Sequence, residues 1–133
     1  MSMNVLLSIK PRYANEILAG RKKYEFRKSR PRLAKRNQKA YVYATAPMSR
    51  IVAAFTINDI VQDSPSRLWN DFGDNAGIDK KSFFEYYGKR KVGVAIEITD
   101  LEVFETPLNP KRLIKGFTAP QSFTYLRRTL RHR

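Results

Sequence analysis

The hydrophobic pattern of this chain switches between a two-residue and a 3.6-residue period in an order that few folds accommodate. Apolar residues alternate in a first strand and again through the middle and the later part of the chain, whereas helical stripes follow the first strand and interrupt the later ones. The order is strand, helix, several strands, two helices and then strands. Because a doubly wound α/β fold alternates strictly, this order instead predicts an α+β protein, a mixed β-barrel with helices packed at its ends.

Local signals place the individual elements. Val5, Leu7 and Ile9 alternate with their neighbours as in a strand, and Pro11 opens a helix that Gly20 closes. A strand is expected over 24–27, a mobile loop over 28–39, and strands over 40–45 and 51–57. Two helices follow, capped by Ser64 and Asp79. A long or bent strand is expected over 91–104, followed by breaks at Pro107 and Pro110. The expected core includes Leu7, Ile17, Phe26, Val42, Val52, Phe55, Val94 and Ile96.

The charge is strongly basic and unevenly distributed. The chain of 133 residues carries 26 basic and 12 acidic residues, a net charge of +14. Residues 1–58 contain 13 basic and 2 acidic residues and residues 111–133 contain 7 basic residues, whereas residues 59–110 carry 6 basic and 10 acidic residues. Such an excess favours a polyanionic partner through counterion release. If the two ends of the chain meet in space, they form one basic face.

Several classes of protein fit the composition poorly. The chain contains no cysteine, which argues against a disulfide scaffold and a thiolate zinc site, and its single histidine, His132, lies in a basic tail. We therefore expect no metal and no cofactor. The apolar runs are too short to span a membrane and the N-terminus lacks the pattern of a signal peptide, so a cytoplasmic protein without membrane contact is expected.

One short segment combines residue types that suit a binding or catalytic site. In Gly20–Arg27, Glu25 and Arg27 share one face of a strand and Lys22 lies at the turn before it. Glu25 can orient either cation or accept a hydrogen bond from a base, and Arg27 can bind a phosphate or stack on a base. A solvated strand face with an ion pair explains the same spacing equally well.

The segment is similar to the signature G-x-K-x-x-E-x-R of the ASCH domain, in the PUA-like superfamily, with Gly20, Lys22, Glu25 and Arg27 at the matching positions. Further resemblance lies in Leu7–Pro11, Val42–Pro47, Leu68–Trp69 and Ala119–Leu126. The resemblance implies a domain over 1–126, a basic tail over 127–133 and a barrel of five to six strands, with the signature residues lining a cleft beside the first helix. Some members of the family are predicted transcriptional regulators, and others are amidohydrolases acting on acetylated cytidine or ribonucleases.

Two hypotheses follow. In the first, the chain binds nucleic acid, with RNA favoured over single-stranded DNA or a nucleotide. The residues expected to bind it are Lys10, Lys22, Lys23, Glu25, Arg27, Lys28, Arg30, Lys35, Arg36, Gln121 and Ser122, with Tyr43 and Trp69 as stacking candidates or core residues. In the second, the chain is a small hydrolase that uses Lys22 and Glu25, with Ser8, Tyr24 or Ser122 as a nucleophile. The sequence does not indicate the oligomeric state.

Overall fold

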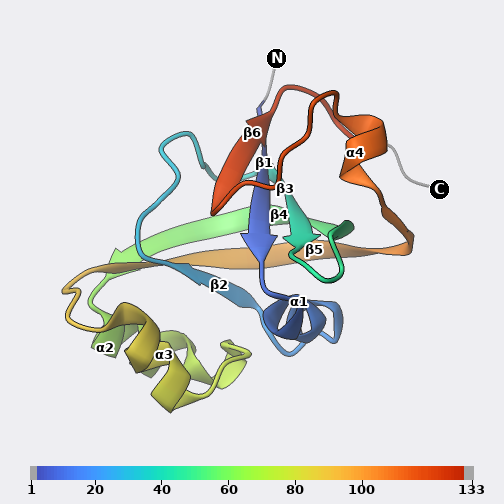
Figure 1. Cartoon of the computed structure of the whole chain (residues 1–133). Helices are drawn as coiled ribbons and strands as arrows, with labels where there is room; N and C mark the ends of the chain where they lie inside the picture. The colour runs from blue at the N-terminus through green and yellow to red at the C-terminus, as the bar shows by residue number, and fades with distance from the viewer. Residues whose placement is uncertain (1–2, 131–133) are drawn as a thin grey trace.

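A computed structural model describes residues 3–130, which form one curved sheet with helices at its two ends (Figure 1). The strand order is β2-β5-β4-β3-β1-β6, in which β1 and β3 run parallel and the other neighbours antiparallel. The elements are β1 (Asn4–Ile9), α1 (Pro11–Leu18), β2 (Tyr24–Arg27), β3 (Lys39–Ala44), β4 (Arg50–Asp63), α2 (Pro65–Phe72), a 3-10 turn η1 (Gly73–Asn75), α3 (Lys80–Tyr87), β5 (Gly93–Leu108), α4 (Pro110–Leu113) and β6 (Phe123–Leu126). The predicted α+β architecture is confirmed.

Two long strands curl this sheet into a half-barrel. β4 and β5 span 14 and 16 residues, and their pairing shifts register at three places. Such irregularities bend a strand and increase its twist. The curl brings the edge strand β2 back toward β1, where the Arg27 guanidinium donates a hydrogen bond to the Ser8 carbonyl. A side chain therefore bridges a seam that the strands leave open.

The core lies inside the curve of the sheet and under the helices. All eight residues predicted for the core are buried, and none is more than 7% exposed. The main cluster unites β1, β3, β4, β5 and the inner face of α1, and a second cluster packs α2 and α3 against Phe26 and Ala95. The periodicity of the sequence thus predicted the core residues correctly, although β1 and β3 are also buried on their other face, where Leu6 and Tyr41 belong to a further cluster.

The predicted helix boundaries are confirmed by their caps. The Ser64 hydroxyl accepts a hydrogen bond from the Arg67 amide at 3.2 Å, and the Asp79 carboxylate accepts one from the Ser82 amide at 3.1 Å. Gly20 has a φ of +81°, the left-handed conformation that glycine adopts after a helix without steric cost.

The predicted break at Pro107 is wrong, because β5 continues to Leu108. Val103 pairs with Ala53 and Leu108 pairs with Ile51, and the register shifts between these two pairs. Pro107 lies within this irregular stretch, where the ladder does not require its missing amide proton. Residues 28–38 form a loop as expected; Ala34 in it is buried, its carbonyl accepts a hydrogen bond from Arg30 Nε at 3.0 Å, and the mobility of the loop stays a prediction.

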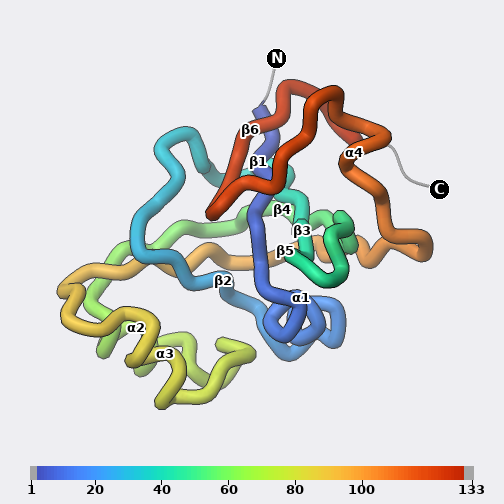
Figure 2. Tube along the Cα trace, viewed as in Figure 1, coloured from blue at the N-terminus to red at the C-terminus, as the bar shows by residue number. Residues whose placement is uncertain are grey.

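The two ends of the described chain lie side by side. β6 pairs antiparallel with β1, as the red and blue segments of the trace show (Figure 2). Beyond β6, the Arg128 carbonyl accepts a hydrogen bond from Asn4 Nδ2 at 2.9 Å, and the Leu130 amide donates one to the Tyr41 hydroxyl at 2.8 Å. The basic segments at the two ends therefore meet. The domain boundary at 126 stays a prediction, and residues 131–133, with His132, lie outside the described residues.

Candidate functional site

A pocket of about 780 Å³ opens between the curved sheet and the helices α1 and α3. Its lining comes from the end of β1, the start of α1, β2, α3 and the segment before β6. This volume lies within the range of small-molecule and cofactor sites, which are usually apolar pockets with a few convergent polar groups. Phe26 and Phe83 are apolar members of the lining, and Lys22, Glu25 and Arg27 are its buried charged members.

These three side chains form an ionic cluster with Glu25 at its centre. Glu25 Oε1 lies 3.7 Å from Lys22 Nζ, and Glu25 Oε2 lies 3.1 Å from Arg27 Nε. Lys22 is 4% exposed, Glu25 7% and Arg27 9%. Two buried cations share one carboxylate, so the ionised cluster retains one positive charge. Because buried charges are costly without partners, the residual charge favours an anionic ligand in the pocket.

Lys22 is held by groups that are distant in the sequence. Its Nζ donates a hydrogen bond to the Ala76 carbonyl at 2.8 Å and lies 5.1 Å from the ring centroid of Phe26 and 5.6 Å from that of Tyr13. Burial lowers the pKa of Lys22 below its ordinary value of 10.5, and the nearby Glu25 carboxylate opposes this effect. An amine with a lowered pKa is a better candidate for a base than an exposed lysine.

The turn between α2 and α3 shapes the wall behind Lys22. Gly77 has a φ of +63°, and a Cβ atom at this position would clash with Lys22 Cβ. The Lys23 amide donates a hydrogen bond to the Asn75 carbonyl at 2.8 Å. Neighbouring carbonyls of the turn thus bind the Lys22 side chain and the backbone of the next residue. Glycine at position 77 permits this close approach.

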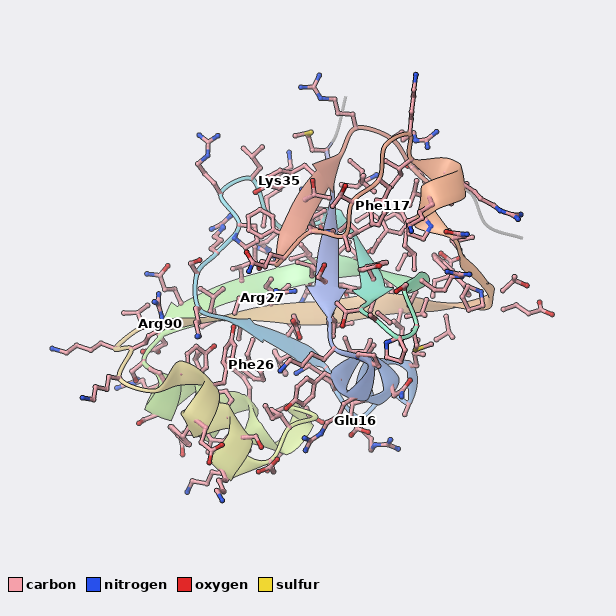
Figure 3. All side chains as sticks on the ribbon, in the orientation of Figure 1. Glu16, Phe26, Arg27, Lys35, Arg90 and Phe117 are labelled. Atoms are coloured by element: carbon pink, nitrogen blue, oxygen red, sulfur yellow. The ribbon has the colours of Figure 1, made fainter. Side chains whose placement is uncertain are left out.

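Arg27 joins the cluster to the two strands across the seam. Its Nη1 donates a hydrogen bond to the Ser122 hydroxyl at 3.1 Å and its Nη2 donates one to the Ser8 carbonyl at 3.1 Å. Figure 3 shows the side chain between β2 and β1. Arg27 therefore serves the fold as well as the pocket.

The expectation that Glu25 and Arg27 form a charged outer face of β2 is wrong. Both side chains are buried, because the curl of the sheet places that face against the pocket rather than against water. Phe26, the residue between them in the strand, packs in the cluster beneath α2 and α3, and it also borders the pocket. An alternating pattern identifies two faces but does not distinguish solvent from a polar interior.

The structure brings together seven of the residues predicted to bind nucleic acid and leaves four elsewhere. The pocket is lined by Lys10, Lys22, Glu25, Arg27, Lys28, Gln121 and Ser122. Lys23 lines a second pocket on the other side of the Lys22 backbone. Arg30, Lys35 and Arg36 belong to the loop 28–38, and Arg36 Nε donates a hydrogen bond to the Asn58 carbonyl. Figure 3 places Lys35 well away from Arg27.

The aromatic residues of the pocket are not those the sequence suggested. Tyr43 is a core residue that is 4% exposed and packs edge-on against Phe117. Trp69 is partly buried and packs against Phe83, at the edge of the core cluster beneath α2 and α3. Tyr13 and Tyr86 line the pocket instead. Tyr13 follows the Lys-Pro step that opens α1, a signal within the family motif, whereas Tyr86 carries no signal that sequence alone could separate from Tyr87 beside it.

Hydroxyl groups also surround the ionic cluster. Of the three nucleophile candidates, Ser8 and Ser122 line the pocket, whereas Tyr24 stacks on Phe72 with ring centroids 4.3 Å apart and lies outside it. The Ser8 hydroxyl donates a hydrogen bond to the Pro120 carbonyl at 2.7 Å. Within residues 3–130, no three His, Asp or Glu side chains gather as a metal site would require, and no helix is long and apolar enough to cross a membrane.

The curled six-stranded sheet and its helices are those of a PUA-like domain of the ASCH type. The chain belongs to the family described as Domain of unknown function (DUF365), whose model matches residues 2–118. A relative from Zymomonas mobilis subsp. mobilis, described as an ASCH domain-containing ribonuclease, is 28% identical over 126 residues, which cover 92% of this chain and 84% of the relative.

Solved structures agree with this assignment. The crystal structure of ASCH from Zymomonas mobilis superimposes with a TM-score of 0.86 at 27% identity and covers 93% of this chain and 87% of that chain. Crystal structures of a Tyr-to-Phe and a Ser-to-Ala variant of the Zymomonas protein match equally well, with TM-scores of 0.86 and 0.85 at 26% identity over 93% of this chain and 90% and 88% of theirs.

Proposed function

We propose that this chain binds single-stranded RNA and holds one nucleotide in the charged pocket. The observation that carries the proposal is the ionic cluster of Lys22, Glu25 and Arg27, whose net positive charge is buried where a ligand would lie. Lys10 and Lys28 add exposed cations to the same pocket. Phosphate contacts supply most of the affinity for a nucleic acid, and polar groups around the base supply selectivity.

A single strand suits this pocket better than a duplex. The cations at its floor are no more than 9% exposed, so the ligand group that reaches them must enter the pocket. Unpaired nucleotides can be splayed out and stacked on aromatic side chains, whereas an A-form helix offers mainly its backbone and minor groove. Tyr13 and Tyr86 are aromatic members of the lining. RNA is preferred over DNA because the Zymomonas relative is described as a ribonuclease.

Cleavage of the bound RNA is the second candidate function, and the environment of Lys22 favours it. In RNA, the 2′-oxygen attacks the adjacent phosphorus while the bond from phosphorus to the 5′-oxygen breaks. A base removes the 2′-hydroxyl proton and an acid protonates the leaving 5′-oxygen, which yields a 2′,3′-cyclic phosphate and a 5′-hydroxyl. Lys22, with its lowered pKa, is the candidate base, and Arg27 would stabilise the charge that develops on the phosphate.

One experiment tests both functions. Labelled single-stranded RNA, DNA of the same sequence and duplex RNA are titrated with the wild-type chain, Lys22→Met and Glu25→Gln, and the products are separated afterwards. We expect the wild type to bind single-stranded RNA at least tenfold more tightly than the duplex, and Lys22→Met to lose at least tenfold in affinity, about 1.4 kcal/mol. Lys81→Met, which removes an exposed lysine of α3, is the matched control and should bind as the wild type does.

The outcomes separate the two functions. Equal binding of duplex and single strand, or unchanged binding by Lys22→Met, would contradict the proposed RNA site. If the chain cleaves RNA, cyclic phosphate ends should appear with the wild type, disappear with Lys22→Met and disappear when the attacking 2′-hydroxyl is replaced by hydrogen. Binding without these products would leave the chain an RNA-binding protein and would exclude Lys22 as the base.

A further inference from the structure

Tyr86 is an exposed aromatic residue in the lining of the pocket. It is 39% exposed and lines the pocket, whereas its neighbours in α3, Phe83 and Tyr87, are at most 2% exposed. Of these aromatic residues, Phe83 and Tyr86 both line the pocket, and Tyr86 is the exposed one of the two.

The ring of Tyr86 is held in place by buried neighbours. It packs edge-on against Tyr87, with ring centroids 5.0 Å apart and planes at 68°. The Tyr87 hydroxyl in turn donates a hydrogen bond to the Arg27 carbonyl at 3.0 Å. An aromatic ring that is already ordered loses little conformational entropy when a ligand covers it.

A cation lies directly over this ring. Lys28 Nζ is 5.0 Å from the centroid of Tyr86, and Lys28 also lines the pocket. Lys28 directly follows β2, next to Arg27 of the ionic cluster. An exposed ring and an exposed ammonium group are therefore in contact with one another beside a buried positive charge.

The charged groups of the ionic cluster act on the Tyr86 hydroxyl. Burial raises the pKa of this tyrosine, and the charge of Arg27 and a backbone hydrogen bond with Lys28 act in the opposite direction. Tyr86 therefore lies within electrostatic reach of Arg27 of the ionic cluster.

We propose that Tyr86 and Lys28 form a mouth subsite, in which the Tyr86 ring stacks on a nucleobase of single-stranded RNA and the Lys28 ammonium group binds the adjacent phosphate. This subsite rests on the proposed RNA-binding function, and its two residues contact the strand where it enters the pocket. The ammonium group leaves the face of the ring when the base arrives and moves to the phosphate.

The magnitudes favour this exchange. An exposed cation–π contact contributes a factor of about 2 to 5 to an equilibrium constant. Stacking of a base on an aromatic side chain contributes a factor of roughly 5 to 150, as measured by alanine substitution. The base therefore displaces the lysine with a net gain, and the lysine recovers an ionic contact with the phosphate.

Oligonucleotides with and without bases test the subsite. Wild type, Tyr86→Leu, Tyr86→Phe and Lys28→Gln are titrated with a short adenylate RNA and with an abasic strand of the same length and backbone. Tyr86→Leu should lose roughly 5- to 150-fold in affinity for the adenylate, the range that the stacking contribution implies. It should bind the abasic strand within about twofold of the wild type. Tyr86→Phe keeps the stacking face and should bind both strands as the wild type does.

Lys28→Gln should weaken binding to both strands, because both retain the phosphates. Equal losses from Tyr86→Leu on the two strands would mean that the ring supports the fold and would overturn the stacking role. Unchanged binding of the adenylate by Tyr86→Leu, while Lys22→Met loses it, would overturn the subsite and leave the RNA site intact. Failure of the wild type to bind the adenylate would overturn both.

Discussion

Lys22 is a buried residue in the lining of the pocket, so its ammonium group has little contact with water. Its three donors are offered one close carbonyl, that of Ala76 at 2.8 Å, and one carboxylate oxygen of Glu25 at 3.7 Å. Burying a charge to this extent is unfavourable unless protein groups replace the hydration that the charge loses. Because the pKa of Lys22 is lowered in the folded chain, its protonated form disfavours folding more than its neutral form does.

This burial predicts a pH-dependent stability. A lysine with a lowered folded pKa binds fewer protons in the folded than in the unfolded chain between the folded pKa and 10.5, so stability rises with pH across that window. We expect the free energy of unfolding of the wild type, minus that of Lys22→Met, to increase as the pH rises from neutral to 10.5. Urea unfolding of both proteins at a series of pH values measures this difference. The titration of the tyrosines contributes equally to both proteins and cancels. A constant difference would contradict the burial of a titrating lysine.

The turn between α2 and α3 packs against Lys22, which lies in the segment between α1 and β2. Residues 73–79 supply the carbonyl of Ala76 and the close approach of Gly77, and they join two helices whose aromatic residues cover Phe26. The sequence predicted both helices and their caps. It did not predict that the turn between them contacts a lysine 54 residues earlier, because no local pattern encodes such a contact.

Alanine substitutions at two glycines with similar φ angles distinguish the cost of backbone strain from the cost of a steric clash. Gly77→Ala places a methyl group against Lys22, whereas Gly116→Ala, at a φ of +68°, meets nothing within 4 Å. Both changes carry the cost of a left-handed conformation, about 1–2 kcal/mol. Urea unfolding should therefore show a loss of that size for Gly116→Ala and a larger one for Gly77→Ala. Affinity for single-stranded RNA should fall with Gly77→Ala alone. Equal losses of stability and affinity would refute the role of the turn in positioning Lys22.

At the scale of the whole molecule, strand pairing brings the two basic segments together. β6 lies beside β1, and residues that follow β6 contact Asn4 and Tyr41. The acidic middle of the chain forms the β4–β5 ribbon and the helical region. In the RNA complex that we propose, the basic ends would attract the polyanion and the pocket would supply the local contacts.

Salt dependence distinguishes these two contributions. Each phosphate contact on a single strand contributes about 0.7 to the slope of log affinity against log salt, so the double change Lys35→Ala and Arg36→Ala should reduce the slope by about 1.4 if both residues bind phosphates. It should weaken all RNA sequences alike. Glu25→Gln should alter base preference and leave the slope nearly unchanged. Titrations of homopolymer RNAs between about 50 and 200 mM salt measure both effects. The double change Lys80→Ala and Lys81→Ala is the control, and a slope that falls equally in both double variants would argue against a specific basic surface.

The sequence by itself determined most of the strands, the first three helices with their caps, the eight core residues, the uneven charge and the segment from Gly20 to Arg27. Each of these depends on neighbours within a few turns or on composition. The tertiary structure decided that the charged face of β2 is interior, that Arg27 meets Ser122 at a distance of 95 residues along the chain, and that Tyr86 rather than Trp69 lines the pocket. These contacts depend on the register shifts of β4 and β5 and on the curl that follows from them. A local pattern cannot specify them, since the same alternation is compatible with a flat sheet whose charged face is in water.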